Sequence, residues 1–287
     1  MDEGRARSRI RVPRGMADRA REFAEAGQRP AVPRDAATVI LVRPGPGDSG
    51  VEVFLLRRTR ALEFAPGACV FPGGSVDERD ADPAITGDGW VGPSPAEFGQ
   101  LLGIAEDRAR ALVCAAVRET FEESGVLLAG PSRAELVQDS AIQDQHALLE
   151  GALSFGDLLS RRGLALRADL LTPWARWITP EISPRRFDTW FFAAALPPGQ
   201  LAGLAGAGPG ESDSGIWWRP AAALEAARAG QITLLPPTAV TLAELAAYQD
   251  VAGILGERRV ITPLMPTVVV EDERAWLAMP QATEYPL

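Results

Sequence analysis

The chain of 287 residues contains no lysine, one histidine and only two cysteines. The absence of lysine disfavours Schiff-base chemistry, which usually uses a lysine, and leaves all cationic chemistry to arginine. The single histidine, His146, and the widely separated Cys69 and Cys114 disfavour a Ser-His-Asp triad and a zinc site. If the protein is an enzyme, its acid–base groups are therefore expected to be carboxylates and its electrophile a metal ion.

Long apolar runs and basic clusters are also missing. No apolar run approaches the length of a membrane span, and no apolar segment follows the arginine-rich N-terminus as in a secretory signal. The formal net charge is −9, which disfavours nucleic acid as the main partner. The two cysteines fit reduced, buried thiols. These features predict a cytoplasmic protein that acts on small molecules, with no membrane or nucleic-acid partner.

The composition of the chain changes near residue 34. Residues 1–34 contain nine arginines and five acidic residues, so the remainder is strongly acidic. We expect 1–34 to be an arginine-rich N-terminal arm with a short helix over 15–27, and 35–287 to form a single domain. The arm either extends as a tail or packs on the acidic body.

Strand-like and helix-like patterns follow one another in mixed order. Two β-rich runs, 36–42 and 51–58, flank a Pro/Gly-rich turn and predict a hairpin. An apolar stripe over 105–124 predicts a long helix that stops at Gly125. The mixed order predicts an α+β fold, an α/β/α sandwich. The other expected elements are strands at 68–71, 126–128, 172–179, 189–196 and 215–218, helices over 133–163, 220–229 and 237–251, a surface excursion at 77–100, a loop at 199–210 and an extended tail at 263–270.

The long helix carries three carboxylates, Glu119, Glu122 and Glu123, at positions i, i+3 and i+4. On a helix these side chains share one face. Bunched carboxylates repel one another unless a cation lies between them, and charged oxygen ligands suit Mg²⁺ or Mn²⁺. Arg118 lies one turn before Glu122 and can brace that carboxylate. A solvated acidic helix face with one ion pair is the alternative interpretation.

Two separated segments resemble the halves of a Nudix box. That signature is a glycine, five residues, a glutamate, seven residues, and then R-E-U-x-E-E-x-G-U, where U is a bulky apolar residue. The second half begins at Arg118 and matches except at Thr120. The first half follows Gly73-Gly74, and counting from Gly74 places the loop glutamate on Asp80. Asp80 precedes Arg118 by 38 residues rather than 8, so the box contains an insertion of 30 residues.

A split box of this kind resembles one branch of the Nudix hydrolase superfamily, the branch of the peroxisomal coenzyme A diphosphatase. Segments 34–39, 64–74 and 177–189 resemble that branch too. The resemblance implies a Nudix-type α/β/α sandwich with a mixed sheet, an insertion at about 81–110 and a C-terminal helical extension at about 220–287. The insertion borders the box, so it forms a lid, a specificity wall or a contact in a homodimer.

The resemblance implies metal-dependent hydrolysis of a nucleoside diphosphate linked to another moiety. Coenzyme A or acyl-coenzyme A is the leading substrate, giving 3′,5′-ADP and 4′-phosphopantetheine. A signature found in coenzyme A diphosphatases of another branch is only partly present, since Leu55, Arg58 and Gly67 match whereas Thr59 and Glu63 do not. The alternatives are a pyrophosphatase acting on ADP-ribose, NADH or another nucleotide, and a non-catalytic nucleotide-sensing module.

The resemblance also assigns roles to residues of this chain. Arg118 is expected to orient the glutamates, and Glu119 to orient or deprotonate the attacking water. Many members of the family use another acidic group from a loop far along the chain. Glu211 is the candidate for this group, and Asp213 is the alternative. Phe187 and the Trp217-Trp218 pair either stack on a base or pack in the core. The expected ligands of Mg²⁺ or Mn²⁺ are Glu119, Glu122, Glu123 and the Gly73 carbonyl. The expected substrate contacts are Gly74, Arg58, Arg185 and Arg186. One of these three arginines alternatively pairs with Asp188.

Overall fold

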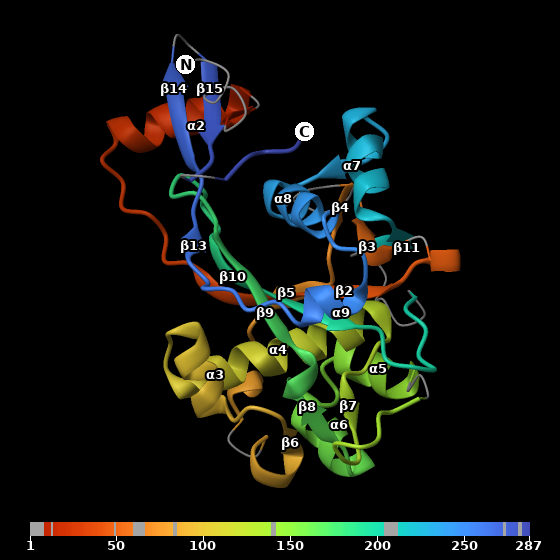
Figure 1. Ribbon diagram of the computed structural model, residues 1–287. Coiled ribbons are helices and arrows are strands. Elements are labelled where there is room, and N and C mark those ends of the chain that lie inside the picture. Colours follow the sequence, from red (N-terminus) through yellow and green to blue (C-terminus); the bar gives the residue numbers. More distant parts are fainter. Residues whose placement is uncertain are drawn as a thin grey trace.

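A nine-stranded mixed sheet separates two layers of helices (Figure 1). The computed structural model describes residues 9–12, 14–48, 50–59, 67–82, 85–138, 142–203, 212–271, 274–280 and 283–287. The main path of the sheet runs β12-β4-β3-β2-β10-β9-β13, with β11 paired to β3 and β5 paired to β2. The strands are β2 (Arg34–Pro44), β3 (Val51–Arg58), β4 (Ala68–Val70), β5 (Gly73–Ser75), β9 (Thr172–Ile178), β10 (Phe187–Ala195), β11 (Ser212–Trp218), β12 (Thr233–Leu234) and β13 (Pro263–Leu264).

Strand β2 lies at the centre of the sheet and is buried on both faces. Alternate side chains point to opposite faces of a strand. Accordingly, Val39 and Leu41 belong to one apolar core, and Ile40 and Val42 to the other. β2 pairs antiparallel with β3, as the predicted hairpin requires, and parallel with β10.

The first helical layer contains the long helix α4 (Glu106–Ser124), together with α3 (Pro95–Leu102), α5 (Ile142–Leu149) and α6 (Phe155–Arg162). The second layer, on the other face, contains α7 (Pro220–Arg228), α8 (Pro236–Leu245) and α9 (Val251–Leu255). Helices on both faces of a mixed sheet confirm the predicted α+β sandwich. A small sheet beside the first layer is formed by β6 (Trp90–Val91), β7 (Ala129–Gly130) and β8 (Ala165–Arg167).

The two ends of the chain fold together on the side of the main sheet opposite α4 (Figure 1). β1 (Arg9–Arg11) pairs with β15 (Arg274–Ala278), which pairs with β14 (Thr267–Glu271), and α2 (Arg14–Glu25) packs on β14 and β15. The described part of the N-terminal segment therefore packs on the C-terminal hairpin. The extended tail expected over 263–270 is instead paired, because β13 bonds to β9 and β14 bonds to β15.

Two further expectations were wrong, and the expected start of a third element was misplaced. The surface excursion expected over 77–100 is partly core, since Trp90 and Phe98 are 8% and 1% exposed and pack on the α4 side. No strand forms over 126–128. The backbone of Leu127 bonds to the side chain of Gln200 in place of a strand partner, with an N···Oε1 distance of 2.8 Å and an Nε2···O distance of 2.9 Å. The helix expected from 133 begins only at Ile142.

The two cysteines are buried thiols that form no disulfide, as predicted. His146 is exposed on α5, which fits the expectation that it is not part of a triad. Among the described residues, no helix has both the length and the apolar character that a membrane crossing requires.

Candidate active site

The C-terminal half of α4 is held firmly at its end. Gly125 follows the helix with a φ of 72°, a left-handed conformation that glycine adopts without strain. The amide nitrogen of Gln145, which is 1% exposed, donates to the carbonyls of Phe121 and Glu122 at 2.9 and 3.0 Å. The Phe121 carbonyl also accepts from the backbone N–H of Gly125 at 2.9 Å, and Gln145 adds a side-chain donor to both carbonyls at the helix end. The turn that carries the glutamates is therefore rigid.

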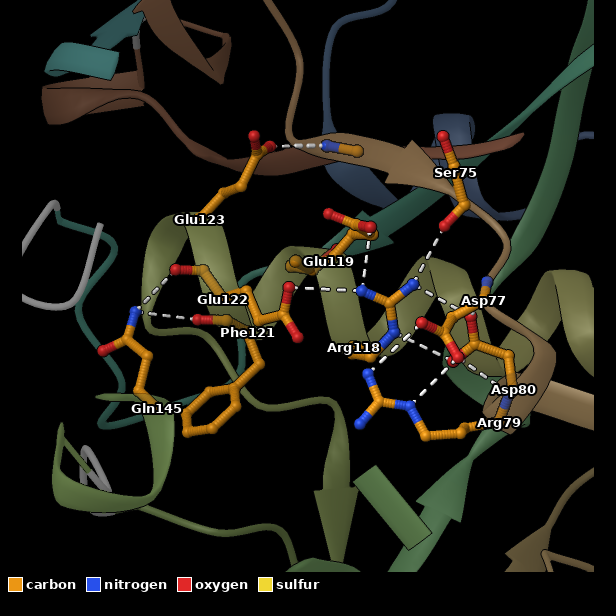
Figure 2. Close-up of polar contacts among 12 residues, drawn as sticks. Ser75, Asp77, Arg79, Asp80, Arg118, Glu119, Phe121, Glu122, Glu123 and Gln145 are labelled. Atoms are coloured by element: carbon orange, nitrogen blue, oxygen red, sulfur yellow. Dashed lines mark hydrogen bonds and ion pairs between the residues drawn. The ribbon is translucent and has the colours of Figure 1, made fainter. Parts of the chain in front are cut away.

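Arg118 stands at the centre of the polar contacts (Figure 2). Its Nη1 donates to Glu119 at 2.8 Å and to Glu122 at 3.2 Å, and its Nη2 donates to the carbonyl of Ser75 at 3.0 Å. Burial alone would lower the pKa of Arg118, but hydrogen bonds to Asp80 and the neighbouring carboxylates raise it above its usual value. The guanidinium therefore stays charged and fixes both glutamates, the position predicted for it.

Asp80 pairs with Arg118 although the insertion separates them in sequence. Nε and Nη2 of Arg118 donate to the two carboxylate oxygens of Asp80 at 2.9 and 2.8 Å, and Asp80 is 2% exposed. Asp80 also accepts from the backbone N–H of Asp77 at 2.8 Å, within the capping box of the 3-10 turn η2 (Glu78–Ala81). The fork geometry orients both partners. The two halves of the predicted box thus meet in space through the Arg118–Asp80 pair.

Gly73 and Gly74 bring strand β5 against α4. The backbone N–H of Gly73 donates to Glu123 at 2.7 Å. A β-carbon at Gly74 would overlap the carboxylate of Glu119, and one at Gly73 would overlap Thr38 and the backbone of β2. Only glycine allows both close approaches. The glycines therefore set the distance between the sheet and the carboxylates.

The cluster carries more negative than positive charge. One arginine, Arg118, contacts the three carboxylates of Asp80, Glu119 and Glu122. The pKa of Glu119 is raised to about 7. Burial is the main cause, the charge of Glu122 adds to it, and Arg118 opposes it. Burial also raises the pKa of Glu122. Burial therefore raises the pKa of both glutamates by more than Arg118 lowers it.

The donor set fits a hard divalent cation by type, because it consists of carboxylate oxygens with excess charge. In the observed conformation these oxygens bind protein donors. Glu119 and Glu122 accept from Arg118, and Glu123 accepts from Gly73 (Figure 2). Within the described ranges, no three His, Cys, Asp or Glu side chains already surround a point where a metal ion could sit.

A cavity of about 320 Å³ adjoins this cluster through Gly73. Its walls come from the sheet face opposite α4, from α8, and from the terminal elements α2 and β15. Arg58, which was predicted to contact substrate, and Phe187, for which base stacking or core packing was left open, lie in its lining, whereas the insertion over 81–110 contributes no described lining residue. Phe187 therefore faces a space where a ligand could bind.

Other predicted site residues are not brought to the cavity. Arg186 is buried and donates to the carbonyls of Ala31 at 2.8 Å and Thr179 at 3.0 Å. Arg185 is exposed and is not part of the lining. Glu211 and the side chain of Asp213 lie outside the described residues, so both remain predictions.

The pairing considered for Asp188 was wrong. Asp188 accepts from Arg108 at 2.7 Å and from Arg176 at 2.8 and 2.6 Å. Among the described hydrogen bonds of Asp188, none comes from Arg58, Arg185 or Arg186. Trp217 lies 5.3 Å from the ring of Phe54 and under Arg43, and Trp218 packs against the α7–α8 core, so the pair is mainly part of the packing.

Two contributors were not found from the sequence as site residues. Gln145 lies beside His146 in a polar stretch with no pattern that marks a helix-end partner. Trp177 lines the cavity, and its only signal was its place in a segment that resembles the split-box branch. Their importance depends on contacts between distant parts of the chain.

Comparison with known proteins gives one consistent result. A family model described as the NUDT19 Nudix domain matches residues 96–245. The acyl-coenzyme A diphosphatase NUDT19 of Xenopus laevis is 28% identical over 254 residues, covering 71% of this chain and 62% of that protein. A putative nudix hydrolase 7 of Caenorhabditis elegans is 31% identical over 218 residues, covering 76% of this chain and 62% of that protein. The chain thus spans about 62% of the length of these two relatives.

A solved structure gives the same architecture. The crystal structure of a NUDIX hydrolase from Alicyclobacillus acidocaldarius superposes with a TM-score of 0.62 at 29% identity, covering 79% of this chain and 97% of that one. The superposition covers a larger share of the chain than the family model matches.

Proposed function

Because this chain belongs to the NUDT19 Nudix domain family, we propose that it is a diphosphatase that hydrolyses coenzyme A or acyl-coenzyme A. Water attacks one phosphorus of the diphosphate and the P–O–P bond breaks, giving 3′,5′-ADP and 4′-phosphopantetheine or its acyl thioester. The matched relative named acyl-coenzyme A diphosphatase supports this choice of substrate.

The observation that carries the proposal is the double role of Gly73. Its N–H binds Glu123, which follows Glu122 of the carboxylate cluster in sequence, and Gly73 also lines the cavity. A diphosphate held at the cluster would therefore extend one of its moieties into the cavity. Arg58, at the end of β3 in the same lining, would pair with a phosphate by the bidentate geometry that arginine offers.

Each residue of the cluster has a proposed role. Glu119, Glu122, Glu123 and the Gly73 carbonyl would hold Mg²⁺ or Mn²⁺, which when bound neutralises the diphosphate and acidifies water. Glu119, whose pKa is raised to about 7, suits proton acceptance near neutral pH. Arg118 orients Glu119 and Glu122.

Product analysis tests the proposal. The protein is incubated with coenzyme A and Mn²⁺, and the mixture is resolved by chromatography with mass detection. We expect 3′,5′-ADP and 4′-phosphopantetheine. Intact coenzyme A beside cleaved ADP-ribose or NADH would instead support the other Nudix pyrophosphatase activity, and no cleavage of any diphosphate would support a nucleotide-sensing module.

A further inference from the structure

The wall of the cavity contains a buried hydrogen-bond donor without an acceptor. Trp177 is 4% exposed and lines the cavity, and within the described part of the chain its indole N–H has no partner. Buried N–H groups are nearly always paired, because a buried donor without an acceptor loses the hydrogen bond that water would provide. An acceptor on a molecule bound in the cavity would satisfy this donor.

The charge of the lining restricts what that molecule can be. Arg58 is the one charged residue among the described lining residues, and the others are apolar, aromatic or hydroxyl-bearing. A 3′-phosphoadenosine moiety carries a second phosphate that needs further cations. A pantetheine moiety is uncharged, and it combines apolar methyl groups with amide carbonyls that accept hydrogen bonds. The lining therefore suits pantetheine better.

The wall remote from the carboxylates is built by the ends of the chain. Met16 of α2 and Leu277 of β15 belong to the lining. Both lie outside residues 96–245, where the family model matches. Figure 1 shows α2 and β15 at one end of the molecule, with the main sheet between them and α4. A group that enters from the Gly73 side would therefore end against these two apolar side chains.

We propose, on the basis of the diphosphatase function above, that this cavity binds the pantetheine half of the substrate. The Trp177 N–H donates to an amide carbonyl of pantetheine. The acyl group of an acyl-coenzyme A packs against Met16 and Leu277, so the terminal elements set the acyl length that fits. The 3′-phosphoadenosine half lies outside the cavity.

Binding of the two products separates the halves of the substrate. Titration calorimetry measures the affinities of 4′-phosphopantetheine and 3′,5′-ADP for the wild type and for Trp177→Phe. This substitution keeps an aromatic side chain but removes the N–H donor. We expect the variant to bind 4′-phosphopantetheine about fivefold to tenfold more weakly, the loss of one hydrogen bond, and 3′,5′-ADP within about twofold. Weakening confined to 3′,5′-ADP, or no change for either product, would overturn the proposal.

A second pair of variants tests the end wall. Met16→Trp fills the remote end of the cavity, whereas Val270→Trp places the same ring on β14, at a position that is 37% exposed and outside the lining. We expect Met16→Trp to raise KM for a long-chain acyl-coenzyme A about tenfold, with KM for coenzyme A within about threefold, and Val270→Trp to change neither. If Met16→Trp does not fold, Met16→Ala should instead favour longer chains. Equal effects on long-chain and free coenzyme A would contradict the wall assignment.

These experiments distinguish this inference from the function on which it rests. Wild-type turnover of coenzyme A tests the function, and the ratio of the two product affinities tests the cavity. Normal turnover together with a Trp177→Phe effect on 3′,5′-ADP alone would overturn only the cavity assignment. Absence of both coenzyme A turnover and 4′-phosphopantetheine binding in the wild type would overturn both.

Discussion

Two arginine–carboxylate networks lie at opposite ends of α4, and they differ in charge balance. Near the start of the helix, Arg108 bonds to Asp35 at 2.6 and 2.9 Å and to Asp188 at 2.7 Å, and Arg176 bonds to Asp188 as well. Two cations there meet two anions. Near its end, one cation, Arg118, meets the three carboxylates of the cluster.

The pKa shifts of the two networks have opposite signs. Burial alone would raise the pKa of Asp188, but hydrogen bonds from Arg176 and Arg108 hold it below its usual value. Burial raises the pKa of Glu119 to about 7, and its one arginine does not offset this. A balanced network is satisfied within the protein and serves the fold. An unbalanced one, kept rigid at some cost, is the arrangement expected of a cation site.

The largest expected effect follows from removing one carboxylate of the unbalanced network. Glu122→Gln should lower kcat by about 10³-fold or more, because it removes a proposed metal ligand while keeping the side-chain shape. Steady-state assays with coenzyme A and Mn²⁺ measure the change. Glu106→Gln, the same substitution in the exposed first turn of α4, is the control and should leave turnover unchanged. Unaltered turnover in Glu122→Gln would contradict the assignment of Glu122 as a metal ligand.

Breaking the balanced network should instead affect the fold. Asp188→Asn leaves Arg108 and Arg176 without their shared anion, so the free energy of unfolding should fall by about 2–3 kcal/mol. Urea denaturation of the metal-free protein measures this. Asp18→Asn, which breaks an exposed pair with Arg21, should change it by less than about 0.5 kcal/mol. Equal effects of the two substitutions would contradict the structural role of Asp188.

The unbalanced network also predicts how stability depends on pH. The pKa of Glu119 is raised from 4.5 to about 7, so the folded protein holds this proton more tightly than the unfolded chain. The contribution of Glu119 to the free energy of unfolding of the metal-free protein should therefore be largest below about pH 5 and should fall as pH rises to about 7, by on the order of 2 kcal/mol. Urea denaturation with a chelator measures it, and Glu119→Gln should flatten this part of the profile. An equally steep profile in that variant would assign the effect to another group.

The smallest expected effect concerns metal affinity. A cation binds ionised Glu119 and so competes with the proton. Mn²⁺ affinity should fall roughly tenfold between pH 8 and pH 6, as Glu119 with a pKa of about 7 becomes protonated. Electron paramagnetic resonance of free Mn²⁺ measures it. Affinity that stays constant over this range would exclude Glu119 from the ligands.

Local patterns predicted the parts of the site that lie within single segments. The i, i+3, i+4 glutamates required only a helix, and Gly73-Gly74 together with the count to Asp80 required only the spacing of the box. The hairpin of β2 and β3 followed from alternation around a turn. In each case the physical cause lies within a few residues of the motif.

The rest depended on contacts across long distances in sequence. Arginine is a common phosphate ligand, but the guanidinium of Arg186 donates to backbone carbonyls 7 and 155 residues away in sequence. Phe98 lies in a stretch rich in Asp, Gly and Pro that reads as exposed, yet it packs 6.5 Å from the ring of Phe192. The far wall of the cavity joins the two ends of the chain, which no local pattern encodes.

A titration of Mn²⁺ into three proteins at pH 8 tests the central claim, that charge imbalance at the end of α4 marks a cation site. The wild type and Asp188→Asn should bind Mn²⁺ with affinities within about threefold of each other. Glu119→Gln should bind at least about tenfold more weakly, because it removes an anionic ligand from the unbalanced network. Equal affinity in all three proteins, or a loss confined to Asp188→Asn, would contradict the account.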